Sequence, residues 1–129
     1  MKAIVLNIHD MFGNRYKSLI VCNDNDNLEE VWSKYPYTEV ESVDYTEYVM
    51  DKNYKDIHED VDEFIKDKTY NHLTAIVLNI YDMFGNRYKM VILANDNDNL
   101  EEIWNKYPYT EVESIDYVEY VMDKNYNRI

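Results

Sequence analysis

The run NDNDNLEE occurs at residues 23–30 and again, letter for letter, at residues 95–102. Carboxylates and carboxamides at this density can hold a calcium ion, start a helix or form an acidic surface. A calcium loop needs a glycine at its sixth position and a bidentate acid at its twelfth. Counted from Asn23, those positions hold Leu28 and Lys34. The spacing therefore argues against a calcium site.

The other side chains that do chemistry in proteins form no catalytic or metal-binding pattern. His9, His58 and His72 lie in different predicted elements, and Cys22 is replaced by Ala94 in the second copy of a repeat. An acid–base pair of carboxylates needs a pocket that drives the two pKa values apart, and the sequence indicates none. We therefore expect a protein that is not an enzyme and that uses no metal or cofactor.

The repeat is an internal duplication of most of the chain. Residues 3–54 align without gaps with residues 75–126, and 43 of the 52 positions are identical. The only two glycines, Gly13 and Gly85, are equivalent, and so are the only two prolines. Since a unit of this size buries only a marginal core alone, we expect the two units to pack on each other.

Each copy opens with two β-rich runs on either side of a Gly-Asn pair, which predicts a hairpin with a two-residue loop. The implied register places Asp10 opposite Lys17, and it pairs Tyr81 with Met90 where the first copy has a polar pair. We expect Tyr81 and Met90 to form an apolar outer face that contacts the other unit, the connecting segment or a second chain. The core face would hold Ile4, Leu6, Ile8, Leu19 and Val21.

The repeated acidic run precedes a short amphipathic helix. Apolar residues recur at the helical period from Leu28 to Tyr35, and Pro36 then ends the pattern. Asp26 or Asn27 can supply the N-cap side chain, with a glutamate in the first turn. The run is therefore, at minimum, a helix start.

The third segment of each copy, 38–50 and 110–122, is rich in Val, Thr and Tyr and predicts a strand. Its alternation of polar and apolar residues slips near Ser42, where we expect a break. Tyr45 and Tyr48 would also suit a helix, so this alternative stays open.

Residues 55–74 lie between the copies and place apolar residues at helical spacing, which predicts a connecting amphipathic helix. The expected fold class is α+β, with two tandem β-β-α-β repeats and antiparallel sheets. The units would be residues 1–54 and 75–129. We expect one compact pseudo-symmetric body, with two lobes joined by the helix as the alternative.

The formal net charge is -13, from 26 acidic and 13 basic residues. Such a charge repels nucleic acids and anionic membranes, so a partner that binds the surface should be basic. No segment has the roughly 18 apolar residues that a membrane-spanning helix needs. A single cysteine fits a reducing compartment, and we expect a cytoplasmic protein.

The acids form two equivalent predicted clusters. Residues two apart on a strand lie about 6.6 Å apart on one face, a spacing similar to that of nucleic-acid phosphates. We interpret the protein as a nucleic-acid mimic that inhibits a nucleic-acid-binding protein. In size and charge it resembles the small acidic DNA-mimic inhibitors with which phages and mobile elements block restriction or CRISPR nucleases. The expected partner-binding residues are Asp24, Asp26, Glu29, Glu30, Glu39, Glu41, Asp44, Glu47 and Asp51, and then Asp96, Asp98, Glu101, Glu102, Glu111, Glu113, Asp116, Glu119 and Asp123.

Two other functions remain open. The protein could be a bivalent interaction module, in which each repeat docks one copy of a symmetric partner through Tyr, Trp and Met contacts. A homodimer is a separate possibility. The protein could also bind a small nucleotide between the repeats. Phosphate donors would then be Arg15, Lys17, Arg87 and Lys89.

Overall fold

The computed structural model describes residues 1–35, 39–66, 72–107 and 111–129. Within these residues the fold is α+β, with two four-stranded mixed sheets and three short helices. The first half contains β1 (Lys2–His9), β2 (Arg15–Cys22), α1 (Leu28–Ser33), β3 (Val40–Tyr45), β4 (Tyr48–Met50) and α2 (Val61–Lys66). The second half contains β5 (Leu73–Tyr81), β6 (Arg87–Asn95), α3 (Leu100–Asn105), β7 (Val112–Val118) and β8 (Tyr120–Met122).

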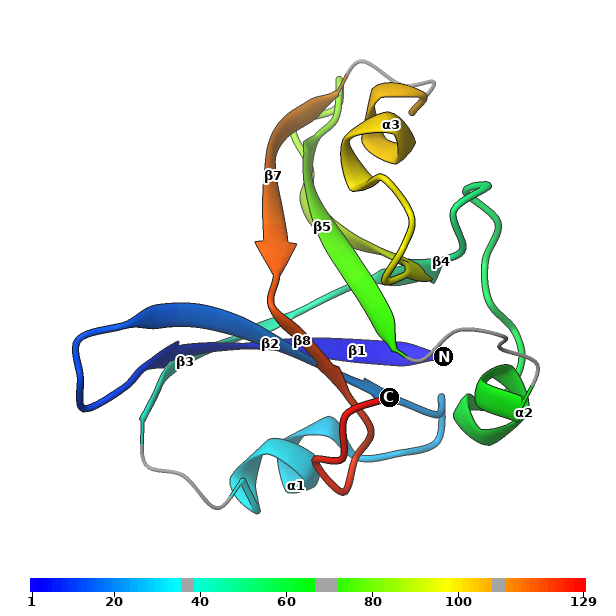
Figure 1. Ribbon diagram of the computed structural model, residues 1–129. Coiled ribbons are helices and arrows are strands. Elements are labelled where there is room, and N and C mark those ends of the chain that lie inside the picture. The colour runs from blue at the N-terminus through cyan, green and yellow to red at the C-terminus, as the bar shows by residue number, and fades with distance from the viewer. Residues whose placement is uncertain (36–38, 67–71, 108–110) are drawn as a thin grey trace.

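The two repeats exchange their last strands. The first sheet has the order β3-β1-β2-β8 and the second has the order β4-β6-β5-β7, so β8 lies in the sheet of the first repeat and β4 in that of the second. Both exchanged strands pair in parallel with their new neighbours, whereas the other pairs are antiparallel. The sheets are therefore mixed, and the expected antiparallel sheets do not describe them. Figure 1 shows β7 continuing into β8 as the chain passes from one sheet to the other.

The strands β1 and β2 are buried on both faces, because each face packs on a different layer. Ile4 and Leu6 lie under α1 in one apolar cluster. Ala3 and Val5 belong to a second cluster, which also contains β5 and β6 residues and fills the space between the sheets. The helices α1 and α3 cover the outer faces of the first and second sheets (Figure 1). This layering makes one body with the main core between the sheets.

The core between the sheets keeps its volume although the copies differ there. Leu19 and Val21 of the first copy correspond to Val91 and Leu93 of the second, and all four side chains belong to the central cluster. The exchange of one large and one small side chain is a volume-conserving change of the kind that cores tolerate best.

The predicted hairpin register is wrong. His9 pairs with Arg15 and Asn7 pairs with Lys17, so Asp10 lies in the loop and not opposite Lys17. The loop is five residues long, 10–14, because the Asp10 carboxylate accepts hydrogen bonds from backbone amides inside it. As a result, the side chains of the predicted core face divide between the two clusters. Leu19 and Val21 face the other sheet, whereas Ile4, Leu6 and Ile8 face α1.

The same correction applies to the second copy. Tyr81 pairs with Arg87, whose guanidinium carbon lies 4.4 Å from the centre of the Tyr81 ring. Met90 pairs with Leu78 and packs in the cluster under α3. The predicted Tyr81–Met90 pair therefore does not form.

The slip in the third segment is a β-bulge. The pairing of β1 with β3 shifts between Asn7 and Ile8, which leaves Glu41 as the extra residue. A second break, at residues 46–47, is where the chain changes sheets. In the connecting segment, helix α2 spans only Val61–Lys66 of the expected 55–74. Its expected continuation through residues 67–71 lies outside the described residues. Helix α1 ends at Ser33 with Lys34 as its C-cap, earlier than the expected end at Pro36.

Candidate functional site

The repeated acidic run starts a helix in both copies, as predicted. The side chain of Asn27 accepts a hydrogen bond of 3.3 Å from the Glu30 amide, and Asn99 accepts one of 3.2 Å from Glu102. The carboxylate of Asp26 holds the loop before the helix by accepting a 2.9 Å bond from the Asn23 amide. Asn27, and not Asp26, is therefore the N-cap residue.

Several of the predicted partner-binding acids bind atoms of their own chain. The Glu47 carboxylate accepts a 2.8 Å hydrogen bond from the backbone amide of Lys89, and Glu119 accepts one of 2.7 Å from Lys17. Each bond joins the two repeats where an exchanged strand begins. These two glutamates stabilise the strand exchange.

Two clefts lie beside the crossing strands, and Asp116 lines both of them. Asp44 accepts a 2.9 Å bond from the Asn7 side chain, whose oxygen in turn accepts from the Lys17 ammonium at 2.5 Å. Asn79, Lys89 and Asp116 repeat this network in the second copy. The clefts have volumes of about 340 and 580 Å³. Cations and acids alternate along them, which does not suit a phosphate group.

Asp51 and Asp123 hold tight turns. Asp51 accepts bonds from two amides of the turn, and Asp123 does the same. Tyr54 and Tyr126 in these turns have φ angles of 65° and 68°, a left-handed conformation that bulky residues rarely adopt. Their hydroxyls donate to backbone carbonyls of the opposite repeat. That contact holds the left-handed turn in place.

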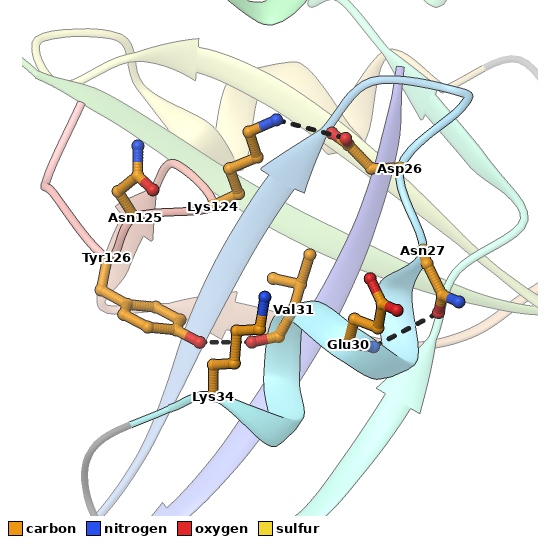
Figure 2. A pocket seen from close by; sticks show the side chains of 8 residues that line it. All are labelled: Asp26, Asn27, Glu30, Val31, Lys34, Lys124, Asn125 and Tyr126. Carbon is orange, nitrogen blue, oxygen red and sulfur yellow. Dashed lines mark hydrogen bonds and ion pairs between the residues drawn. The ribbon is translucent and has the colours of Figure 1, made fainter.

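The seam between the repeats contains a pocket of about 390 Å³ (Figure 2). The Lys124 ammonium reaches across it to the Asp26 carboxylate at 3.3 Å, and the Tyr126 hydroxyl donates to the Val31 carbonyl. Lys52 and Asp98 make the equivalent 3.4 Å pair. These residues join the repeats, and Asp26 and Asp98 are partly neutralised there.

Several of the exposed acids lie around the loop before α1 and around α2. The Val61 amide donates a 2.8 Å bond to the Asn23 side chain, which fixes the start of α2 against this loop. The N-terminal ammonium bridges Asp24 at 2.8 Å and the Ile57 carbonyl at 3.3 Å. We call this region the α1–α2 acidic surface. Its exposed acids are Asp24, Glu29, Glu30, Glu59, Asp60, Asp62 and Glu63.

Among the residues that the structure describes, the α1–α2 acidic surface is not repeated on the second copy. There, the Asp96 amide donates to the His72 carbonyl at 3.0 Å, so the loop meets the chain entering β5. Glu101 and Glu102 are exposed at the start of α3. Glu41 and Glu113 form surface pairs with Arg15 and Arg87 at 3.8 and 3.5 Å, and Glu39 and Glu111 are half-buried. The acids of α2 had no place among the predicted site residues, although their density in the sequence was a usable signal.

The hairpin loops 10–14 and 82–86 present large apolar side chains to solvent. Met11 and Phe12 are 80% and 82% exposed, and their equivalents Met83 and Phe84 are 79% and 82% exposed. Sequence reasoning missed them because the predicted two-residue loop assigned these side chains to the strands. The signal was two adjacent large apolar residues beside a Gly-Asn turn.

The remaining candidates have ordinary surroundings. Burial raises the pKa of the Cys22 thiol from its ordinary value of 9.0 to about 11. Tyr81 is about half exposed, and Met90 accepts a 3.2 Å contact from the Tyr107 hydroxyl. Across the described ranges, no group of three or more His, Cys, Asp or Glu side chains is placed to hold a metal ion. In the same part of the chain, no helix has the length and apolar character needed to cross a membrane.

Comparison of the chain with protein-family models, curated proteins and solved structures found no match.

Proposed function

We propose that the protein is a non-enzymatic inhibitor that binds the basic nucleic-acid-binding surface of another protein, as a nucleic acid would. The supporting observation is the α1–α2 acidic surface, which has seven exposed acids on two helices and on the two loops that precede them. The partner would be a nuclease of a restriction or CRISPR system, and the inhibitor would come from a phage or a mobile element and act in the host cytoplasm.

The binding would combine long-range attraction with direct contacts. A net charge of -13 steers a basic partner towards the chain and raises the association rate. Exposed carboxylates of α2 would then pair with lysine and arginine side chains that normally contact phosphates.

We also propose that the duplicated chain consists of two β-β-α-β units that descend from the two halves of a dimer. The strand exchange is reciprocal, because β4 pairs with β6 in the way that β8 pairs with β2. A symmetric dimer whose subunits swap a terminal strand would have this arrangement after fusion.

The test is capture from a bacterial lysate on the immobilised full chain at low salt, with parallel elution by duplex DNA and by sodium chloride. The proposal expects a nucleic-acid-binding protein that leaves with DNA. Captured proteins that stay bound during elution with DNA and with high salt would contradict it, because binding by charge-based mimicry weakens steeply with ionic strength.

A matched pair of variants shows which acids act. The first variant combines Glu30→Gln, Asp62→Asn and Glu63→Gln on the α1–α2 acidic surface. The control combines Asp96→Asn, Glu101→Gln and Glu102→Gln on the second copy and removes the same number of charges. The proposal expects at least a tenfold loss of affinity in the first variant only. Equal losses would mean that net charge, and not this surface, carries the binding.

A further inference from the structure

We propose that the hairpin tips 10–14 and 82–86 are twin apolar anchors, each of which inserts its Met-Phe pair into an apolar, basic-rimmed pocket of a partner protein. The chain would thereby hold two copies of that partner. This inference goes beyond the mimicry described above and does not depend on it.

The first step is the exposure of the tips. Phe12 and Phe84 are each 82% exposed, whereas most other large apolar side chains of the described residues are buried or half-buried. An aromatic ring of this kind buries a large area when it enters a pocket and commonly carries much of the energy of an interface. Two adjacent exposed apolar side chains at the end of a protruding hairpin are therefore well placed to act as an anchor.

The second step is the order within the loop. The Asp10 carboxylate accepts 2.9 Å bonds from the Phe12 and Asn14 amides, and Gly13 takes the required φ of 86°. Asp82 makes the same bonds in the second loop. A loop already held in one conformation loses little entropy on binding, so the exposed Met-Phe pair is presented ready to dock.

The third step is the charge around each tip. Asp10, Glu39 and Glu41 lie beside the first tip together with the cation Arg15, which pairs with Glu41 at 3.8 Å. The second tip repeats these four residues. Each apolar tip therefore has an acidic rim, which fits a pocket with a basic rim. An anionic membrane or a second copy of this chain would be repelled by the net charge of -13.

The fourth step is the placement of the two tips. The loops have identical sequences, and the two hairpins point in different directions from the body (Figure 1). Both tips project from sheets that share one core, so each would engage its own partner molecule. Binding of a symmetric partner by both tips at once would raise the overall affinity.

The two tips should differ in strength. A groove of about 390 Å³ beside the second tip is lined by Phe84, Met90 and Tyr107, among others. The first copy has Ser18 in place of Met90. The second tip therefore offers a larger apolar contact, and we expect it to bind more tightly.

Photo-crosslinking in a bacterial lysate tests the proposal with the full chain. A p-benzoyl-phenylalanine is placed at Phe12, at Phe84 or, as a control, at the exposed Asn97, which lies outside the α1–α2 acidic surface. The expected result is the same protein cross-linked from both tips and not from the control position, through a peptide that mixes apolar and basic residues. No cross-link above the control, or cross-links to this chain itself, would overturn the proposal.

Substitution then tests the stoichiometry with the cross-linked protein as the probe. Phe84→Ser should leave one partner copy bound, and the double variant Phe12→Ser with Phe84→Ser should lose binding by at least about 30-fold. Both variants should have the melting temperature of the wild type, because the two phenylalanine rings are exposed to solvent. A double variant that binds as the wild type does would overturn the proposal.

Two further experiments separate apolar anchoring on a protein from membrane binding and from charge-based mimicry. Wild-type binding to mixed phosphatidylcholine and phosphatidylglycerol vesicles, lost in the double variant, would assign the tips to a membrane and refute a protein partner. The triple variant of the α1–α2 acidic surface keeps both tips intact. If this variant still cross-links through the tips, the tips bind their partner without the acidic surface. The anchor proposal then holds even if the nucleic-acid-mimic proposal is wrong.

Discussion

The Glu47 carboxylate of the first repeat accepts a 2.8 Å hydrogen bond from the backbone amide of Lys89 in the second repeat. The Glu47 amide donates at 3.0 Å to the carbonyl of the same Lys89. Glu119 and Lys17 repeat both contacts in the opposite direction. Each glutamate thus binds the other repeat through its side chain and its backbone at the point where a strand changes sheets.

Replacing Glu47 with alanine should lower the free energy of unfolding by about 1 kcal/mol, since it removes a charge-assisted hydrogen bond at a partly solvated site. The melting temperature should fall by roughly 4 °C. Calorimetry of the full chain measures the change. Glu41→Ala is the control, because Glu41 makes only a 3.8 Å surface pair with Arg15 and such pairs are worth little. Equal effects in the two variants would show that Glu47 does not lock the exchanged strand.

The hairpin tips should loosen in acid. Amide hydrogen bonds from Asn14, and then from Phe12, hold the pKa of Asp10 below its ordinary value of 3.8, and Asp82 is held in the same way. Because the folded pKa is the lower one, the stabilisation is present above pH about 4 and is lost as the pH falls through the folded value. The protection factors of the Phe12 and Asn14 amides, measured by NMR hydrogen exchange, should therefore fall below pH about 4 more than those of the β1 amides. Asp10→Asn should show fast exchange already at neutral pH, and slow exchange in that variant would refute this role of the carboxylate.

Cys22 should be inert in the folded protein. It lies under α1, 1% exposed, and burial raises its pKa to about 11. Because the folded pKa is above the unfolded one, the associated stability is present below pH about 9 and is lost as the pH rises towards 11. A thiol reagent at pH 8 should label the native chain far more slowly than the chain in denaturant. Cys22→Ala should also fold, because Ala94 fills the equivalent position. Rapid labelling without unfolding would show that this site opens.

The hairpin strands, the helix starts and the break near Ser42 could be predicted from the sequence. These features follow from local rules of alternation, capping and turn chemistry, which act within a few residues. The hairpin register was missed because Met11 and Phe12 look like strand residues. Only the hydrogen bonds of Asp10 show that they belong to the loop.

The strand exchange could not be read from the sequence for a different reason. The strands β2 and β6 are equivalent in the two copies and share four of eight residues, so both offer a similar backbone edge to Tyr48–Met50. Local pairing preferences therefore cannot say whether β4 joins its own sheet or the other one. The choice depends on how the two sheets face each other, which is a property of the packed body. For the same reason, the convergence of α2 with the loop at Asn23 was not visible in advance.

This ambiguity predicts the behaviour of a single repeat. A fragment of residues 1–58 contains β1 to β4 but lacks β6, on which β4 pairs. In a dimer of the fragment, β4 of each copy can pair with β2 of the other, because β2 presents a backbone edge equivalent to that of β6, with Ser18 in place of Met90. We expect the fragment to sediment as a dimer in analytical ultracentrifugation. Its folded fraction should rise with protein concentration.

The control for this fragment is Val49→Asp. Val49 is 4% exposed in the core between the sheets, so an unpaired carboxylate there should prevent the exchange. The variant fragment should stay monomeric and largely unfolded at concentrations where the parent fragment is a folded dimer. If the parent is instead a folded monomer at all concentrations, β4 pairs within its own sheet when the second repeat is absent. The exchange would then be a consequence of the covalent duplication and not its origin.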